Sequence, residues 1–233
     1  KKYHLTRNEK NRHCLHIGIH SVSFINWTLV SVREEDTCAE ALFQCTLPGC
    51  CDGFPGNRTF SVSYLLNEAH ELTVRYRAVS DKTTYFNMSN HSYFNLDGDP
   101  SKDNSDYLLT LNADYYTPVD STFMTTGEIV PVEGTPMDFR LPAVIGTRIN
   151  QDFEQLRYGN GIDHNWVLNT KGDIHQVCAT LESPVTGIVL NVYTDEPGIQ
   201  VYCGNFLDGT LTGKKNTIYN FRASVCLETK KYP

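Results

Sequence analysis

The sequence predicts an all-β fold made of large antiparallel sheets. Apolar and polar residues alternate with period two in several segments, most clearly from His70 to Val79, as in strands that bury one face. Turn residues, such as those of Glu196-Pro197-Gly198, separate these segments. Helical spacing of apolar residues occurs in a single segment, so the repeated strand-helix-strand units of an α/β protein are not predicted.

The predicted strands follow one another along most of the chain. They cover residues 41–47, 60–66, 70–79, 107–113, 177–182, 187–193 and 200–203. Asn67 to His70 would join two of them as a hairpin loop. The helical candidate runs from Ile145 to Leu156, although Gly146 lowers its helix propensity. A chain of 233 residues can bury one sizeable core, and no linker divides it, so we expect a single domain over residues 1–233.

Charge and composition narrow the choice of partners. The formal net charge is −7 and no Lys/Arg cluster is present, which argues against nucleic acid or an anionic membrane as partner and favours a neutral small molecule. No apolar run is long enough to cross a bilayer. The eight cysteines form no Cys-x-x-Cys motif, so we expect free thiols and a cytoplasmic protein.

The ends of the sequence leave the compartment open. The polar start at Lys1 is not a signal peptide, but the chain does not begin with Met. We therefore expect that an upstream part is missing, and a periplasmic or secreted protein is the alternative. The sequence gives no indication of the oligomeric state.

Three segments that otherwise have the pattern of β-strands, the one around His91 included, supply side chains suited to proton transfer. His91 lies in the polar-aromatic run from Asn90 to Asn95, and an imidazole can donate or accept a proton near neutral pH. Glu228 follows an apolar stretch, where partial burial would make it a better base. Asp163 stands between a Gly-rich loop and an apolar strand, at a place where it would bind hydroxyl groups and where Trp166 would pack beneath or beside it. Each also has an ordinary structural alternative, as a hydrogen-bonded core histidine, a strand-end glutamate or a turn-capping aspartate.

A metal site is the competing interpretation of the N-terminal segment. His13, Cys14, His16 and His20 crowd together there, and His16 and His20 have helical ligand spacing. Ile17 occupies the place of a metalloprotease glutamate, however, and Gly18 disfavours a helix. The sequence therefore predicts no metal and no cofactor.

Several motifs together resemble the aldose 1-epimerase (galactose mutarotase) family, in the same order as in the family. They are Asn90-His91-Ser92-Tyr93-Phe94-Asn95-Leu96, Gly127-Glu128-Ile129, Gly134-Thr135-Pro136-Met137-Asp138-Phe139-Arg140, Asp163-His164-Asn165, Tyr193-Thr194-Asp195-Glu196-Pro197-Gly198-Ile199-Gln200, Gly204-Asn205-Phe206-Leu207 and Cys226-Leu227-Glu228-Thr229. The resemblance implies a β-sandwich with an open polar cleft.

The resemblance also implies a role for each candidate residue. His91 would be the catalytic acid and Glu228 the catalytic base, while His16, Asp163 and Gln200 would bind substrate. The sequence departs from the family at Ile17, where the family has glycine, and at Lys230, where it has glutamine. The family's segment with a substrate-binding arginine and its C-terminal end have no counterpart, so we expect a chain truncated at both ends.

The implied reaction interconverts the α and β anomers of an aldohexose such as galactose or glucose by acid-base ring opening, without a cofactor. We expect His91 and Glu228 to face each other across a gap about one pyranose wide. The alternatives are a non-catalytic carbohydrate-binding relative, a hexose-6-phosphate 1-epimerase, for which no converging set of Arg and Lys is apparent, and a glycosidase that uses Asp163 and Glu228.

Overall fold

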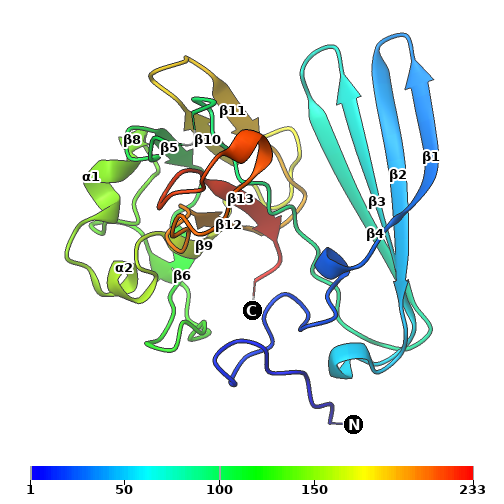
Figure 1. Ribbon diagram of the computed structural model, residues 1–233. Coiled ribbons are helices and arrows are strands. Elements are labelled where there is room, and N and C mark those ends of the chain that lie inside the picture. Colours follow the sequence, from blue (N-terminus) through cyan, green and yellow to red (C-terminus); the bar gives the residue numbers. More distant parts are fainter. Residues whose placement is uncertain (1, 100, 233) are drawn as a thin grey trace. The chain divides into compact units, whose positions relative to one another are not determined.

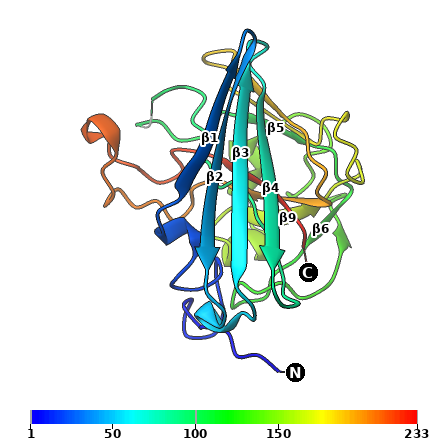
Figure 2. The same cartoon turned by 90° about the vertical axis from the view of Figure 1, so that its right-hand side faces the viewer.

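The computed structural model describes residues 2–99 and 101–232, which divide into two compact units at Met88 and Ser89. The first unit is a four-stranded antiparallel sheet in the order β1-β2-β3-β4. Its strands are Thr28–Glu35 (β1), Cys38–Leu47 (β2), Arg58–Asn67 (β3) and Leu72–Ser80 (β4), and they run as long neighbouring ribbons (Figures 1 and 2). The single domain that the composition predicts stays a prediction.

The hairpin between β3 and β4 forms where the sequence predicts it. Leu66 pairs with Leu72, and the backbone N–H of Asn67 donates to the carbonyl of Glu71 at 3.2 Å. His70 takes the left-handed conformation, with φ of 62°, which a tight connection between twisted strands requires. The turn residues therefore fix the register of this pair of strands.

Asp52 ties the N-terminal segment of the first unit to the turn that follows β2. Its buried carboxylate accepts hydrogen bonds from the backbone N–H groups of Ile19 and His20. The potential metal-ligating atoms of His20, Cys51 and Asp52 lie within 4.8 Å of one another. This set differs from the cluster of His13, Cys14, His16 and His20 in the sequence, since the two share only His20.

The second unit contains two antiparallel sheets. The strands of the first, in spatial order, are Val189–Val192 (β11), Ala179–Glu182 (β10), Leu108–Leu111 (β5) and Ala143–Val144 (β8). Those of the second are Cys226–Lys230 (β13), Gly198–Tyr202 (β12), Asp163–Val167 (β9), Tyr115–Thr117 (β6) and Val130–Pro131 (β7). Figure 1 shows β9, β12 and β13 side by side.

The main core of the second unit draws buried residues from both of its sheets. Leu109, Leu111 and Leu181 come from one sheet, and Trp166 and Val201 from the other. All five side chains are almost inaccessible to solvent. This shared core is the sandwich arrangement expected when each sheet has one apolar face.

The all-β prediction is confirmed, and the seven predicted strands are all present with boundaries shifted by a few residues. The predicted helix is wrong as a single element, because it forms two short helices, Ile145–Ile149 (α1) and Glu154–Tyr158 (α2), with non-helical backbone at Asn150 and Phe153 between them. The remaining helical pieces are 3-10 turns at Val22–Phe24, Cys51–Gly53 and Lys214–Asn216. Within the described residues, no helix has the length and apolar character of a membrane span.

Candidate functional site

One face of the second sheet in the second unit gathers polar side chains. In the antiparallel register Gln200 lies opposite Glu228 on one side and opposite Asn165 on the other. Residues two apart along a strand share its face, so Asp163 and Lys230 project from the same side. The residues that alternate with these polar ones along the strands point into the core. Trp166, Ile199, Val201 and Leu227 are examples, and all four are buried. We call this polar side the site face.

His91 reaches the site face from a segment outside the sheet. The sequence prediction of a strand around His91 is wrong, since residues 87–93 form no strand and Phe94 makes only an isolated bridge with Val225. Phe94 and Val225 exchange two backbone hydrogen bonds of 2.9 Å, and the Ser89 hydroxyl donates to the carbonyl of Thr229 at 2.9 Å. These bonds hold the segment along β13 and so place His91 beside Glu228.

The imidazole of His91 and the carboxylate of Glu228 are in direct proximity. His91 Nε2 lies 3.4 Å from Glu228 Oε1, with side-chain exposures of 36% and 8%. The expected gap of one pyranose width between them is therefore wrong, although the pair does open to solvent through His91. Close spacing suits the chemistry, because the anomeric hydroxyl and the ring oxygen of an aldose are bonded to the same carbon and need an acid and a base at neighbouring points.

Asp163 and Gln200 form a second polar pair on the site face. Gln200 Nε2 donates to Asp163 Oδ1 at 2.7 Å, and Asp163 begins β9, as predicted from its loop-to-strand position. Burial raises the pKa of Asp163 to about 6, with the Gln200 hydrogen bond opposing the shift and the Glu228 charge adding to it. The expected packing of Trp166 beneath or beside Asp163 is wrong, because Trp166 projects from the opposite side of the sheet into the core.

Burial raises the pKa of Glu228, while the charges of His91 and Lys230 lower it. Lys230 is half-buried, and the same desolvation lowers the pKa of its ammonium, with Glu228 and Asp163 opposing that change. Lys230 lies opposite Gly198 in the register. The sequence marks Lys230 as a departure from the family but gives no sign that it shares a face with both carboxylates.

Aromatic rings line one side of the site. The His91 ring stacks on Tyr93, with centroids 5.1 Å apart, and meets Tyr202 edge-on at 6.1 Å. Tyr202 in turn stacks with Phe206, and its hydroxyl accepts a hydrogen bond from the Phe206 backbone N–H. Tyr202 was not predicted from the sequence, where its signal is its place two residues after Gln200 on the same strand face.

His16, the remaining candidate, belongs to the first unit, in an exposed turn. It has φ of 49°, and the following residue, Ile17, has φ of 71°. Left-handed backbone is strained for a β-branched residue and comfortable for glycine. Ile17 therefore holds a strained backbone conformation at the position where the family has glycine, and a substrate-binding role for His16 stays a prediction.

The raised pKa of Asp163 predicts a cost in stability. Because the folded protein favours the neutral carboxyl, the ionised form destabilises the fold above about pH 6, and this cost fades as the pH falls towards the ordinary aspartate pKa of 3.8. Asp163→Asn should therefore raise the free energy of unfolding by up to about 3 kcal/mol at pH 8, given 1.36 kcal/mol per pKa unit. The gain should disappear near pH 4. Urea titrations at both pH values test this, and an equal effect at both would contradict it.

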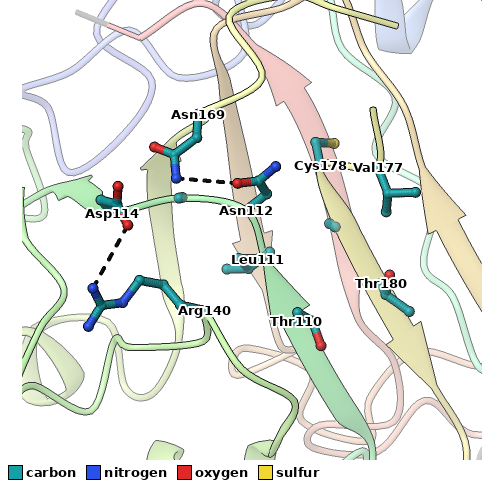
Figure 3. Close-up of a pocket in the computed structure, with 11 residues that line it drawn as sticks. Thr110, Leu111, Asn112, Asp114, Arg140, Asn169, Val177, Cys178 and Thr180 are labelled. Atoms are coloured by element: carbon teal, nitrogen blue, oxygen red, sulfur yellow. Dashed lines mark hydrogen bonds and ion pairs between the residues drawn. The ribbon is translucent and has the colours of Figure 1, made fainter. Parts of the chain in front are cut away.

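A pocket of about 320 Å³ lies elsewhere in the second unit. Figure 3 shows its lining from β5, β10 and nearby loops, with Arg140 directed at Asp114 and the Asn169 amide donating to Asn112. Neither His91 nor Glu228 lines this pocket. The candidate site is thus the site face with its His91 flank. None of the residues named in this site lines the pocket of Figure 3.

Known proteins are similar to this chain in sequence and in fold. The human galactose mutarotase is 40% identical over 233 residues, which are all of this chain and 64% of the human protein. The aldose 1-epimerase of Escherichia coli is 37% identical over 196 residues, covering 84% of this chain and 55% of that protein. The chain therefore spans less than two thirds of the length of these relatives.

Solved structures agree with these sequence relatives. The galactose 1-epimerase of Lactobacillus acidophilus superposes with a TM-score of 0.86 at 31% identity, over 99% of this chain and 65% of that one. An aldose epimerase homologue from C. elegans gives a TM-score of 0.78 at 28% identity, over 91% of this chain and 61% of that one. The model of the aldose 1-epimerase family matches residues 1–233. The chain belongs to the aldose 1-epimerase family.

Proposed function

We propose that this chain catalyses the interconversion of the α and β anomers of an aldohexose, with galactose and glucose as the expected substrates. The observation that carries the proposal is the 3.4 Å approach of His91 Nε2 to Glu228 Oε1 at the edge of a polar sheet face. The relatives named galactose mutarotase and aldose 1-epimerase support the same reaction. A proton-transfer reaction at one carbon matches an acid and a base held this closely.

Ring opening and ring closure each need two proton transfers, and neither needs a cofactor. Glu228 takes the proton of the anomeric hydroxyl while His91 gives a proton to the ring oxygen, and the bond between C1 and the ring oxygen breaks to leave an open-chain aldehyde. Rotation about the bond between C1 and C2 then presents the other face of the carbonyl. Closure returns the proton from the ring-forming hydroxyl to His91 and gives the Glu228 proton to the new anomeric hydroxyl, so both residues end as they began.

Asp163, Gln200 and His16 are proposed to bind the sugar. The Gln200 amide already holds the Asp163 carboxylate, so the two present a fixed pair of hydrogen-bonding groups to sugar hydroxyls. Lys230 is the one Lys or Arg on the site face of β6, β9, β12 and β13. A phosphate is usually met by several basic groups, and this favours a neutral aldohexose over a hexose 6-phosphate.

Polarimetry tests the proposal directly. Freshly dissolved α-galactose and α-glucose should approach anomeric equilibrium faster with the protein than in buffer alone, and a version extended at both ends should be measured beside this chain. Saturation of galactose binding without acceleration would identify a carbohydrate-binding relative. Acceleration with hexose 6-phosphates alone would indicate a hexose-6-phosphate 1-epimerase, and release of reducing sugar from a glycoside would indicate a glycosidase.

We propose a cytoplasmic location from the state of the cysteines. All eight occur as free thiols, and Cys178, Cys203 and Cys226 are buried. Unpaired thiols are usual in reducing compartments, which supports the proposal that the protein works in the cytoplasm.

A further inference from the structure

A row of polar side chains continues across the sheet beyond the proposed catalytic pair. In the register Glu228 lies opposite Gln200, Gln200 opposite Asn165, and Asn165 opposite Thr117. Side chains directly opposite each other share a face, and neighbouring strands are about 4.8 Å apart. We call these four residues the polar row. It begins at the proposed base and ends two strands past Gln200.

The far end of the polar row holds polar atoms without partners. Thr117 is 2% exposed and Asn165 is 4% exposed. Thr117 Oγ1, Asn165 Oδ1 and Asn165 Nδ2 are buried and have no hydrogen-bond partner among the described residues. Burial of such groups without compensation is costly, and native proteins normally satisfy them with protein, water or ligand.

Gly198 makes room for this arrangement. A Cβ at position 198 would lie 2.6 Å from Asn165 Oδ1 and 2.7 Å from the ring of Tyr232. The Asn165 amide therefore leans over a strand position that no side chain fills. The lean brings its carbonyl oxygen towards the part of the site face where Lys230 lies opposite Gly198.

Asn165 Nδ2 and the Thr117 hydroxyl stand at opposed positions of neighbouring strands and together suit one small hydroxyl-bearing group, while Asn165 Oδ1 is directed to the other side, towards Gly198. Asn165 Nδ2 can donate a hydrogen bond, and the Thr117 hydroxyl can donate or accept one. A water molecule or a sugar hydroxyl has the complementary donors and acceptors, and a buried water typically makes about three such bonds. An ion is less suitable, because no charged side chain belongs to this end of the row.

We propose that Thr117 and Asn165 bind one neutral O–H group at the far end of the polar row, either a hydroxyl of the substrate or a fixed water through which the sheet contacts it. The substrate part of this inference rests on the proposed function. Gln200, placed between Asn165 and Glu228, links this group to the catalytic pair. The sugar would then be positioned from both ends of one row.

Thr117→Val tests the proposal, because it removes the hydroxyl with little change in shape. A bound O–H group would lose a partner, so the melting temperature should fall by about 2–4 °C, and KM for galactose should rise about three- to tenfold. If nothing binds there, removing an uncompensated buried hydroxyl should instead raise the melting temperature and leave KM unchanged. Thr117→Ser keeps the hydroxyl and should restore the parental KM.

Two further variants sharpen the test. Asn165→Leu should raise KM to a similar degree, and the double variant with Thr117→Val should lose less than the product of the single losses, since both side chains hold the same group. Thr170→Val is the matched control, because Thr170 is also a buried threonine with an unpartnered hydroxyl but lies outside the four strands of the row. Its KM should equal that of the parent.

Deoxy sugars separate the two sources of the O–H group. If a sugar hydroxyl binds, the parent should discriminate against one particular deoxygalactose, and Thr117→Val should lose that discrimination. If water binds, Thr117→Val should affect all deoxygalactoses equally. A rise in melting temperature together with unchanged KM would overturn the proposal. The thermal measurement does not depend on turnover, so failure of mutarotation in the parent would overturn the proposed function and leave this test intact.

Discussion

Replacing Glu228 by glutamine is expected to slow mutarotation about 10²- to 10⁴-fold, the range typical for loss of a general base. Glutamine keeps the size and the hydrogen-bonding oxygen of the side chain but cannot accept the proton of the anomeric hydroxyl. In the parent, Glu228 Oε1 lies 3.4 Å from His91 Nε2. The variant therefore keeps the acid but lacks the base that acts at the same carbon. Initial rates of polarimetric change with α-galactose measure the loss.

The rate loss should not come from unfolding. Burial raises the pKa of Glu228, which means that the fold disfavours the carboxylate charge, so its removal should leave the melting temperature at neutral pH no lower than in the parent. Glu182→Gln, at a half-buried glutamate of β10, is the matched control and should keep the parental rate. A Glu228→Gln protein with a near-parental rate would refute the role of Glu228 as base.

The same pKa shift sets the direction of the pH dependence. Because the pKa of Glu228 is raised above the ordinary glutamate value of 4.5, the base becomes protonated at a higher pH than an exposed glutamate does. The parental kcat/KM should therefore fall on acidification while the pH is still above 4.5, and this fall should be absent from the residual activity of Glu228→Gln.

Local patterns were sufficient for most of the strands. In Leu72–Ser80 the alternation is visible in the letters themselves, and the structure pairs this strand with Arg58–Asn67 as the intervening turn residues predict. The segment around His91 misled the prediction, because its position depends on two backbone bonds to Val225 and one from Ser89 to Thr229. Partners more than a hundred residues away leave no local pattern.

In the site, too, some residues could be predicted from sequence motifs, whereas others are recognised only from contacts between distant segments. The resemblance supplied His91, Glu228, Asp163 and Gln200, and the structure brings these four together on or beside one sheet face. Asn165 and Thr117 were not predicted as site residues from the sequence. A buried polar residue in a strand is recognised as unusual only when the structure shows that its polar atoms have no hydrogen-bond partner. The short distance between acid and base was also missed, because sequence separation does not show how near two segments lie in the fold.

The positive charge of Lys230 helps to explain how one partly buried sheet face holds the carboxylates of both Asp163 and Glu228. The charge of Glu228 raises the pKa of Asp163, whereas Lys230 lowers the pKa of both carboxyls from the same face. The cation thus favours an ionised Glu228, which is the form that a base requires.

Replacing His91 by asparagine is expected to reduce the mutarotation rate about 10²- to 10⁴-fold as well, because no group then protonates the ring oxygen as the ring opens. The ring is 36% exposed and stacks on Tyr93 at the surface of the unit, so the fold should survive its loss. Free imidazole added to the assay should restore part of the rate. His175→Asn, at an exposed loop histidine, is the control and should be unaffected.

The double variant of His91 and Glu228 decides whether the two residues act in one step. If they transfer protons to and from oxygens on the same carbon, the loss of either already prevents concerted ring opening, and the double variant should be about as slow as the slower single variant. Losses that multiply would instead show independent contributions, and the 3.4 Å proximity of imidazole and carboxylate would then be an ion pair that stabilises β13 rather than an acid-base pair. Imidazole rescue separates the same two cases, because added imidazolium can replace a proton donor from solution but cannot rebuild a structural contact.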